Sequence, residues 1–204
     1  MFVPFLIAAI VLAVTPGPGV TYVIARTIAG GRTEGLASCA GTAVGGMVHV
    51  LAAAAGLSIV LAKSAVVFGV LKYLGALYLL YLGVRILLKR NETFSIRSQA
   101  SHGARKAFLE GVLVEGLNVK TALFFVAFLP QFVSMQAPLA PQLFVLGSIC
   151  VLLNTMVDLI AVFGADRMLR KSAVRATRAR LLNRLSGFTM IGLGAYLALA
   201  ERDS

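Results

Sequence analysis

The apolar stretches of this sequence are interrupted by ionisable side chains, and three of these could handle charge: Glu115, Lys120 and Asp158. Glu115 and Asn118 are three residues apart and share a helix face. Lys120 follows Glu115 by five residues, so an unwound turn between them would bring their charges together. A charge at the centre of a bilayer costs about 2.5–3.5 kcal/mol. The cluster therefore predicts either a site for a charged ligand or an ion pair that satisfies only itself.

Asp158 and His49 are the candidates for moving a proton. Asn154 precedes Asp158 by four residues and lies on the same helix face. A buried carboxylate that alternates between protonated and paired forms suits a proton-coupled carrier, and the alternative is a fixed ion pair with Lys120 or Arg26. His49 continues a face of small residues that favours close packing against another helix. It therefore either relays protons or hydrogen-bonds a neighbouring helix.

The first element that must position such a site is a broken helix. The apolar run from Phe2 to Ile24 would form a helix of roughly 35 Å, long enough to cross a bilayer. The segment Thr15-Pro16-Gly17-Pro18-Gly19 interrupts this run, and proline removes a backbone donor and clashes with the preceding turn. In lipid, such a break survives only where it is packed in protein or lines a cavity. The pattern predicts either the broken helix of a transporter's substrate site or a kinked helix that only packs.

The composition indicates a membrane protein. Of the 204 residues, 59% are hydrophobic and 13% are charged, whereas about one quarter of an ordinary soluble domain is charged. The mean hydropathy is +0.90. These values predict an all-α integral membrane protein with six transmembrane helices, at residues 2–24, 36–62, 66–88, 108–133, 139–165 and 185–200.

The positive charges predict how these helices are oriented. Fifteen of the 19 Lys and Arg residues lie in or beside the first, third and fifth connections. The positive-inside rule places those connections in the cytoplasm and both termini outside. The net charge of +11 thus comes from basic residues that orient the helices in the membrane. We therefore expect the lipid bilayer as a partner and no nucleic acid.

The third connection, residues 89–107, is polar and divides the chain into halves of three helices each. An odd number of helices in each half makes the halves point in opposite directions across the membrane, as in the inverted repeats of many transporters. We therefore predict a single transporter domain over residues 1–204, with repeat one at 1–88 and repeat two at 108–204.

The sequence contains no pattern typical of an enzyme, a metal site or a cofactor site. Cys39 and Cys150 lie in apolar segments and are expected to be small core residues. His49 and His102 lack the spacing of metal ligands. A glycine-rich phosphate loop and a nucleophile triad are also missing. We therefore expect no enzymatic activity, no catalytic residue, no metal and no cofactor.

Motifs over nearly the whole chain resemble the lysine exporter family of bacterial amino-acid exporters. They are Thr15-Pro16-Gly17-Pro18-Gly19, Arg26-x-x-x-x-Gly31-Arg32-x-x-Gly35, Gly41-x-x-x-Gly45 with His49, Leu71-Lys72-Tyr73-Leu74-Gly75-Ala76, Phe108-x-x-Gly111, Asn118-Val119-Lys120, Phe128-Leu129-Pro130-Gln131-Phe132, Asn183-Arg184-x-x-Gly187 and Gly192-x-Gly194. The resemblance implies a multi-pass carrier of the bacterial inner membrane. It also implies export of amino acids driven by the proton gradient.

The chain departs from the family's pattern at three positions. Val119 stands where the family usually has proline, so we keep a site at Asn118 and Lys120 but do not expect a kink there. Glu115 stands where an apolar or small polar residue is usual, and it either alters the charge preference for substrate or pairs with Lys120. Gly19 replaces the usual asparagine and removes one polar group from the first broken helix.

The residues and the resemblance together predict a substrate site near the middle of the bilayer. The substrate-binding residues would be Thr15, Pro16, Gly17, Pro18, Asn118 and Lys120, and the proton-coupling residues would be Asp158, Glu115 and His49. The substrate would be an amino acid, exchanged for a proton as the two halves rock. The alternatives are a stress-opened efflux channel, or a membrane scaffold or sensor that transports nothing. The glycine face of helix 36–62 would serve packing within the chain or a homodimer.

Overall fold

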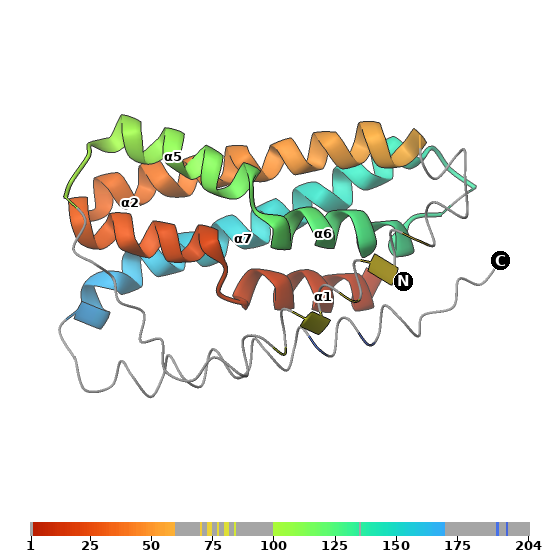
Figure 1. Ribbon diagram of the computed structural model, residues 1–204, viewed down its shortest axis with the longest axis horizontal. Helices are drawn as coiled ribbons and strands as arrows, with labels where there is room; N and C mark the ends of the chain where they lie inside the picture. Colours follow the sequence, from red (N-terminus) through yellow and green to blue (C-terminus); the bar gives the residue numbers. More distant parts are fainter. Residues whose placement is uncertain are drawn as a thin grey trace.

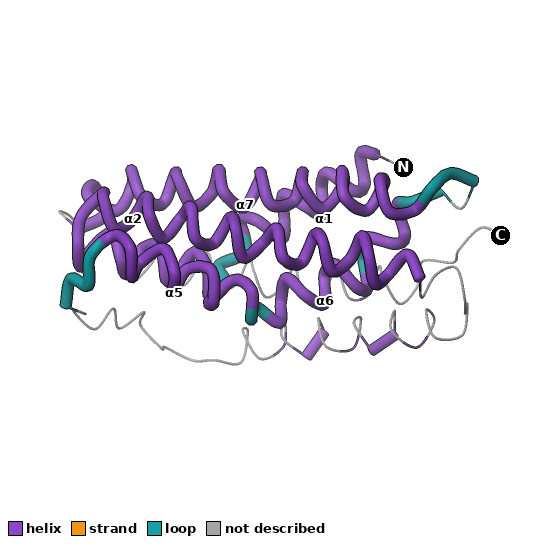
Figure 2. Tube along the Cα trace, turned by 90° about the horizontal axis from the view of Figure 1, so that it is seen from above, coloured by secondary structure: helices purple, strands orange, loops and turns teal. Residues whose placement is uncertain are grey.

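The structure is a computed structural model that describes residues 2–59, 100–134 and 136–169, together with positions 70, 73, 74, 77, 80, 81, 84, 191 and 195. The elements formed by these residues are all helical, with no strand among them, in agreement with the all-α prediction. Figures 1 and 2 show the labelled helices side by side along the long axis of the molecule. The third and sixth predicted transmembrane helices lie almost entirely outside the described residues, so the six-helix inverted repeat and the outward termini stay predictions.

The first predicted transmembrane helix is broken at its prolines. Helix α1 covers Phe2–Val14, and α2 covers Pro18–Ala52 and continues into a π-helical turn, η1, at Ala53–Leu57. Pro18 is well placed at the start of α2, because the N–H that proline lacks has no partner in the first turn of a helix. Gly17 before it is extended and provides no side-chain cap. The break therefore leaves backbone groups of both helix ends available to other partners.

Helix α2 folds back on itself at Gly30 and Gly31. Both have non-helical dihedral angles, and Gly31 has φ 71°, in the left-handed region that favours glycine. Val23 and Cys39 pack in one hydrophobic cluster with Val162, although they would be roughly 24 Å apart on a straight helix. The reversal lies inside the predicted first connection, so the two parts of α2 belong to different passes of the chain.

The fourth predicted transmembrane helix is also broken, although it lacks the family's proline. It consists of α5 at Ala104–Gly116, α6 at Val119–Ala127 and a 3-10 turn, η2, at Leu129–Phe132, and its two parts are bent by 44°. Our expectation of no kink was therefore wrong. Asn118 gives the physical reason: its Oδ1 accepts a hydrogen bond of 3.1 Å from the backbone N–H of Lys120, which caps the start of α6 without a proline.

By length and composition, two of the described stretches could cross a membrane: Leu139–Gly164, and Pro18–Leu57, which contains the reversal of α2 described above. The first belongs to helix α7, Leu139–Leu169. The bent pair Ala104–Gly116 and Val119–Phe132 makes a third span when it is counted as one. The described part of the chain therefore has the helices of a membrane protein.

The contact between α2 and α5 depends on glycine. A Cβ atom at Gly41 would lie 2.1 Å from the carbonyl oxygen of Phe108, and one at Gly111 would lie 2.7 Å from the carbonyl oxygen of Ser38. Small residues let helix backbones approach this closely in lipid. The glycine face of α2 therefore packs within the chain, which is one of the two uses expected for it.

Replacing Gly41 by alanine is expected to destabilise the protein by about 1–3 kcal/mol, because the backbones of α2 and α5 must separate to admit the methyl group. The measurement is thermal unfolding in detergent, followed by maleimide labelling of the buried thiols Cys39 and Cys150. Gly164→Ala is the matched control, since a Cβ there meets no atom of the described residues within 4 Å. Equal melting temperatures for the two variants would contradict the expectation.

Candidate functional site

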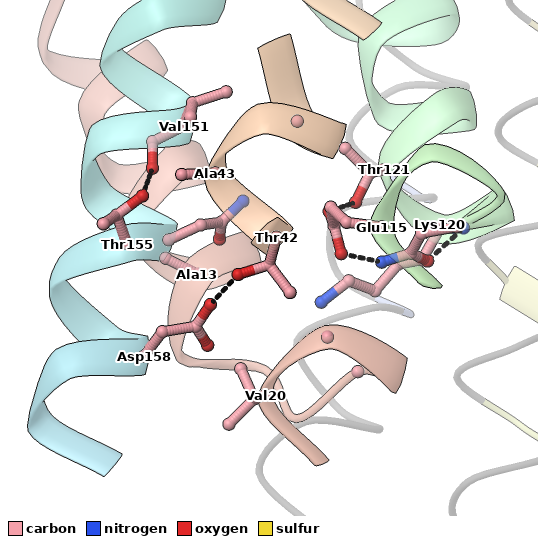
Figure 3. A pocket seen from close by; sticks show the side chains of 15 residues that line it. Ala13, Val20, Thr42, Ala43, Glu115, Lys120, Thr121, Val151, Thr155 and Asp158 are labelled. Carbon is pink, nitrogen blue, oxygen red and sulfur yellow. Dashed lines mark hydrogen bonds between the residues drawn. The ribbon is translucent and has the colours of Figure 1, made fainter. Parts of the chain in front are cut away.

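A small cavity lies where the two broken helices meet. It is lined by residues of α1, α2, α5, α6 and α7, together with Gly17 and Asn118 at the two breaks. Figure 3 shows Thr42, Glu115, Lys120 and Asp158 around it. Its volume is about 20 Å³, room for about one water molecule. The side chains therefore nearly fill the site, and they must move to admit a larger ligand.

Lys120 joins the two breaks. Its Nζ donates hydrogen bonds to the carbonyl oxygens of Leu12 at 3.1 Å and Thr15 at 2.9 Å. The last carbonyls of a helix lack partners within the helix, and a cation there also interacts favourably with the helix dipole. A Cβ atom at Gly17 would lie 3.0 Å from Nζ, so the absence of a side chain at Gly17 lets the ammonium approach. An ammonium has three donors, and two are used by these carbonyls among the described residues.

Glu115 spans the break between α5 and α6. Its Oε2 accepts from Nδ2 of Asn118 at 2.9 Å, and its Oε1 accepts from Oγ1 of Thr121 at 2.6 Å. The side chain is buried, with 7% exposed. A Cβ atom at Gly19 would lie 2.6 Å from Oε2, so the carboxylate rests against the first turn of α2. Both oxygens of Glu115 thus have neutral partners, and neither bonds Lys120.

Asp158 reaches the cavity from α7. Its Oδ2 accepts from Oγ1 of Thr42 at 2.8 Å. Its Oδ1 is buried and has no hydrogen-bond partner among the described residues. Arg26, one of its predicted partners, instead forms an ion pair of 3.5 Å with the buried Glu34. A buried carboxylate oxygen without a partner is costly, so a proton or a cationic ligand would stabilise it.

His49 lies beside this site without lining the cavity. Its Nε2 lies 2.8 Å from the carbonyl oxygen of Glu115, and its ring contacts Phe125. This is the bond to a neighbouring helix that the sequence analysis named as the alternative to a proton relay.

The motif Thr15-Pro16-Gly17-Pro18-Gly19 contributes mainly backbone groups to the site. Thr15 directly follows α1, and its Oγ1 donates to the carbonyl of Val11. The group of Thr15 that bonds Lys120 is its backbone carbonyl. Pro16 and Pro18 are not among the residues that line the cavity. The predicted residues that the structure brings together at the cavity are Gly17, Glu115, Asn118, Lys120 and Asp158.

The cavity residues that sequence reasoning did not assign to the site include Thr42, Thr121 and Gly19. Thr42 and Thr121 bond the two carboxylates, and Gly19 makes room for one of them. Thr42 directly follows a glycine of the packing face, which was a weak signal for an inward position. Thr121 lies six residues after the carboxylate that it bonds, a spacing that becomes a contact only because the helix is broken.

Comparisons with known proteins identify the family of this chain. The family model of the LysE type translocator matches residues 10–201. The chain is 31% identical to the uncharacterized membrane protein YrhP of Bacillus subtilis, over 94% of this chain and 95% of that one. It is 30% identical to the leucine efflux protein of Klebsiella pneumoniae, over 98% and 95%, and 28% identical to an uncharacterized membrane protein of Vibrio cholerae, over 98% of each. No solved structure matches it significantly. The chain belongs to the LysE type translocator family.

Proposed function

We propose that this protein exports amino acids or close derivatives across the bacterial inner membrane in exchange for protons. The family match and the relative named leucine efflux protein support an amino-acid exporter. The observation that carries the proposal is the meeting of two broken helices around Lys120 and the unpartnered oxygen of Asp158. Secondary transporters use broken helices to present helix ends to their substrates.

The substrate carboxylate binds at the start of α2 in this proposal. The first N–H groups of a helix have no partner within the helix and attract anions. Gly19 and Val20, in that first turn, line the cavity, and no side chain caps the helix. Lys120 adds its third donor, while the segment Thr15–Pro18 forms the break that exposes these groups. Asn118 holds the facing segment in place by capping α6.

The substrate ammonium binds Oδ1 of Asp158. This oxygen is the buried acceptor of the cavity that has no partner among the described residues. The carbonyls at the end of α1 are already bound by Lys120. Asn154 and Thr155 line the same wall on α7 and add polar groups around the bound substrate.

The coupling proton is carried by Asp158 or Glu115, the two carboxylates of the cavity. Asp158 carries it most directly, because a protonated carboxyl group no longer attracts an ammonium. Substrate and proton then exclude one another at the same oxygen, and this exclusion is the requirement for antiport. His49 positions the Glu115 segment through its bond to the backbone carbonyl.

The small size of the cavity supports alternating access. A space of about 20 Å³ must widen to admit an amino acid, and the two breaks are the points where helix segments can change direction. We propose that the two three-helix repeats rock around this site and open it to the cytoplasm and the outside in turn. The exporter then needs no continuous pore.

Efflux and counterflow from proteoliposomes test this function. Vesicles are loaded with a mixed pool of the protein amino acids, and release is measured with and without an imposed pH gradient. Saturable, selective release that the gradient accelerates supports the proposal and identifies the substrate. Fast release of every small solute would instead indicate a channel. No release from folded protein would contradict amino-acid export.

A further inference from the structure

The carboxylate of Glu115 lies beside the first turn of α2, next to the place proposed above for the substrate carboxylate. A Cβ atom at Gly19, the second residue of α2, would lie 2.6 Å from Oε2 of Glu115. Any side chain at position 19 would overlap this carboxylate, so Glu115 lies in the space that such a side chain would fill. An acidic group beside the first turn of a helix is stabilised by the helix dipole. Oε2 of Glu115 therefore lies beside the first turn of α2, while its hydrogen bonds go to Asn118 and Thr121.

A second observation indicates that a ligand belongs here. On the opposite wall of the same cavity, Oδ1 of Asp158 is unpartnered among the described residues, and the side chain is 4% exposed. The cavity thus contains an acceptor that lacks a donor, whereas a carboxylate already lies beside the first turn of α2. Figure 3 shows Glu115 and Asp158 in this arrangement, on α5 and α7.

We propose that Glu115 is a built-in competitor, whose carboxylate takes the place of the substrate carboxylate while the site is empty. This inference rests on the proposed function. An incoming amino acid binds its ammonium to Asp158 and displaces Glu115 from the first turn of α2. Asn118 and Thr121, which bond its two oxygens in the empty site, remain beside the displaced carboxylate.

The Glu115 carboxylate also determines which charge the substrate side chain can carry. After displacement, Glu115 remains a negative neighbour of the bound carboxylate. A second carboxylate in the substrate side chain adds further repulsion, whereas a neutral or basic side chain does not. The site therefore takes amino acids with neutral or basic side chains and excludes aspartate and glutamate.

The test is equilibrium binding to the purified full-length protein and its Glu115→Gln variant. The probes are the amino acid that the wild-type protein exports from the mixed pool and the corresponding amino alcohol, which lacks the carboxylate. The Kd for the amino acid is expected to fall roughly five- to thirtyfold in the variant, because an anion no longer lies beside the helix end. The Kd for the amino alcohol is expected to stay unchanged, a difference that a purely structural role would not produce.

Glu110→Gln is the matched control, because Glu110 is on the same helix but is absent from the cavity lining and bonds Tyr22 at 2.9 Å instead. Glu115→Ala is the second variant, should glutamine prevent folding, and it is expected to lower the Kd as well. Aspartate is expected to compete for the site in both Glu115 variants and not in the wild type.

Weaker or unchanged binding of the amino acid to both Glu115 variants, with normal export by the wild type, overturns the competitor role alone. Weaker binding would mean that Glu115 instead attracts the substrate ammonium. A wild-type protein that exports no amino acid overturns the proposed function, and the competitor role with it.

Discussion

Replacing Lys120 by methionine is expected to lower the initial rate of amino-acid export by roughly a hundredfold, because each hydrogen bond from a charged group is worth about 1.5–3 kcal/mol. Methionine keeps an unbranched chain but cannot donate to Leu12 and Thr15 or to a substrate carboxylate. The substitution therefore removes both the hydrogen bonds that connect the two helix breaks and the bond to the substrate carboxylate. The measurement is release of the preferred radiolabelled amino acid from proteoliposomes.

Lys106→Met is the matched control. Lys106 is 57% exposed on α5, and its Nζ lies 3.8 Å from Glu110. Its replacement is expected to leave export close to the wild-type rate, since an exposed ion pair contributes little. Export by a folded Lys120→Met protein at the wild-type rate would show that the substrate site lies elsewhere.

Replacing Asp158 by asparagine is expected to uncouple export from the proton gradient. The amide cannot take up a proton, so an imposed pH gradient should no longer accelerate efflux, while exchange of substrate for substrate continues. The KM should rise about tenfold, because a neutral oxygen replaces a charged acceptor for the ammonium. Efflux and counterflow, measured on the same vesicles with and without the gradient, separate the two effects.

Thr42→Val is the matched variant for this experiment, because it removes the donor to Oδ2 and leaves the carboxyl group in place. It is expected to retain acceleration by the gradient. If the pH gradient still accelerated efflux fully in Asp158→Asn, the coupling proton would be assigned to Glu115. Glu115→Gln should then lose the acceleration of efflux by the gradient.

Local chemistry in the sequence determined the membrane class and the first break. Apolar composition and paired prolines act through short-range effects, namely the transfer of side chains into lipid and the missing backbone donor. The same reasoning identified Glu115, Lys120 and Asp158, because a charge in an apolar segment is conspicuous whatever the fold. The break before Asn118 was not expected, since it comes from a side-chain cap and not from a proline.

The tertiary structure alone decided which groups bond one another. Lys120 bonds carbonyls of α1 more than 100 residues earlier, and Thr42 bonds Asp158 across 116 residues. The space that Gly19 leaves for Glu115 likewise depends on how α2 and α5 are packed. No helical period links such positions, because their proximity results from packing between helices. The sequence therefore determined which side chains need partners, and the packing of broken helices decided which partners they have.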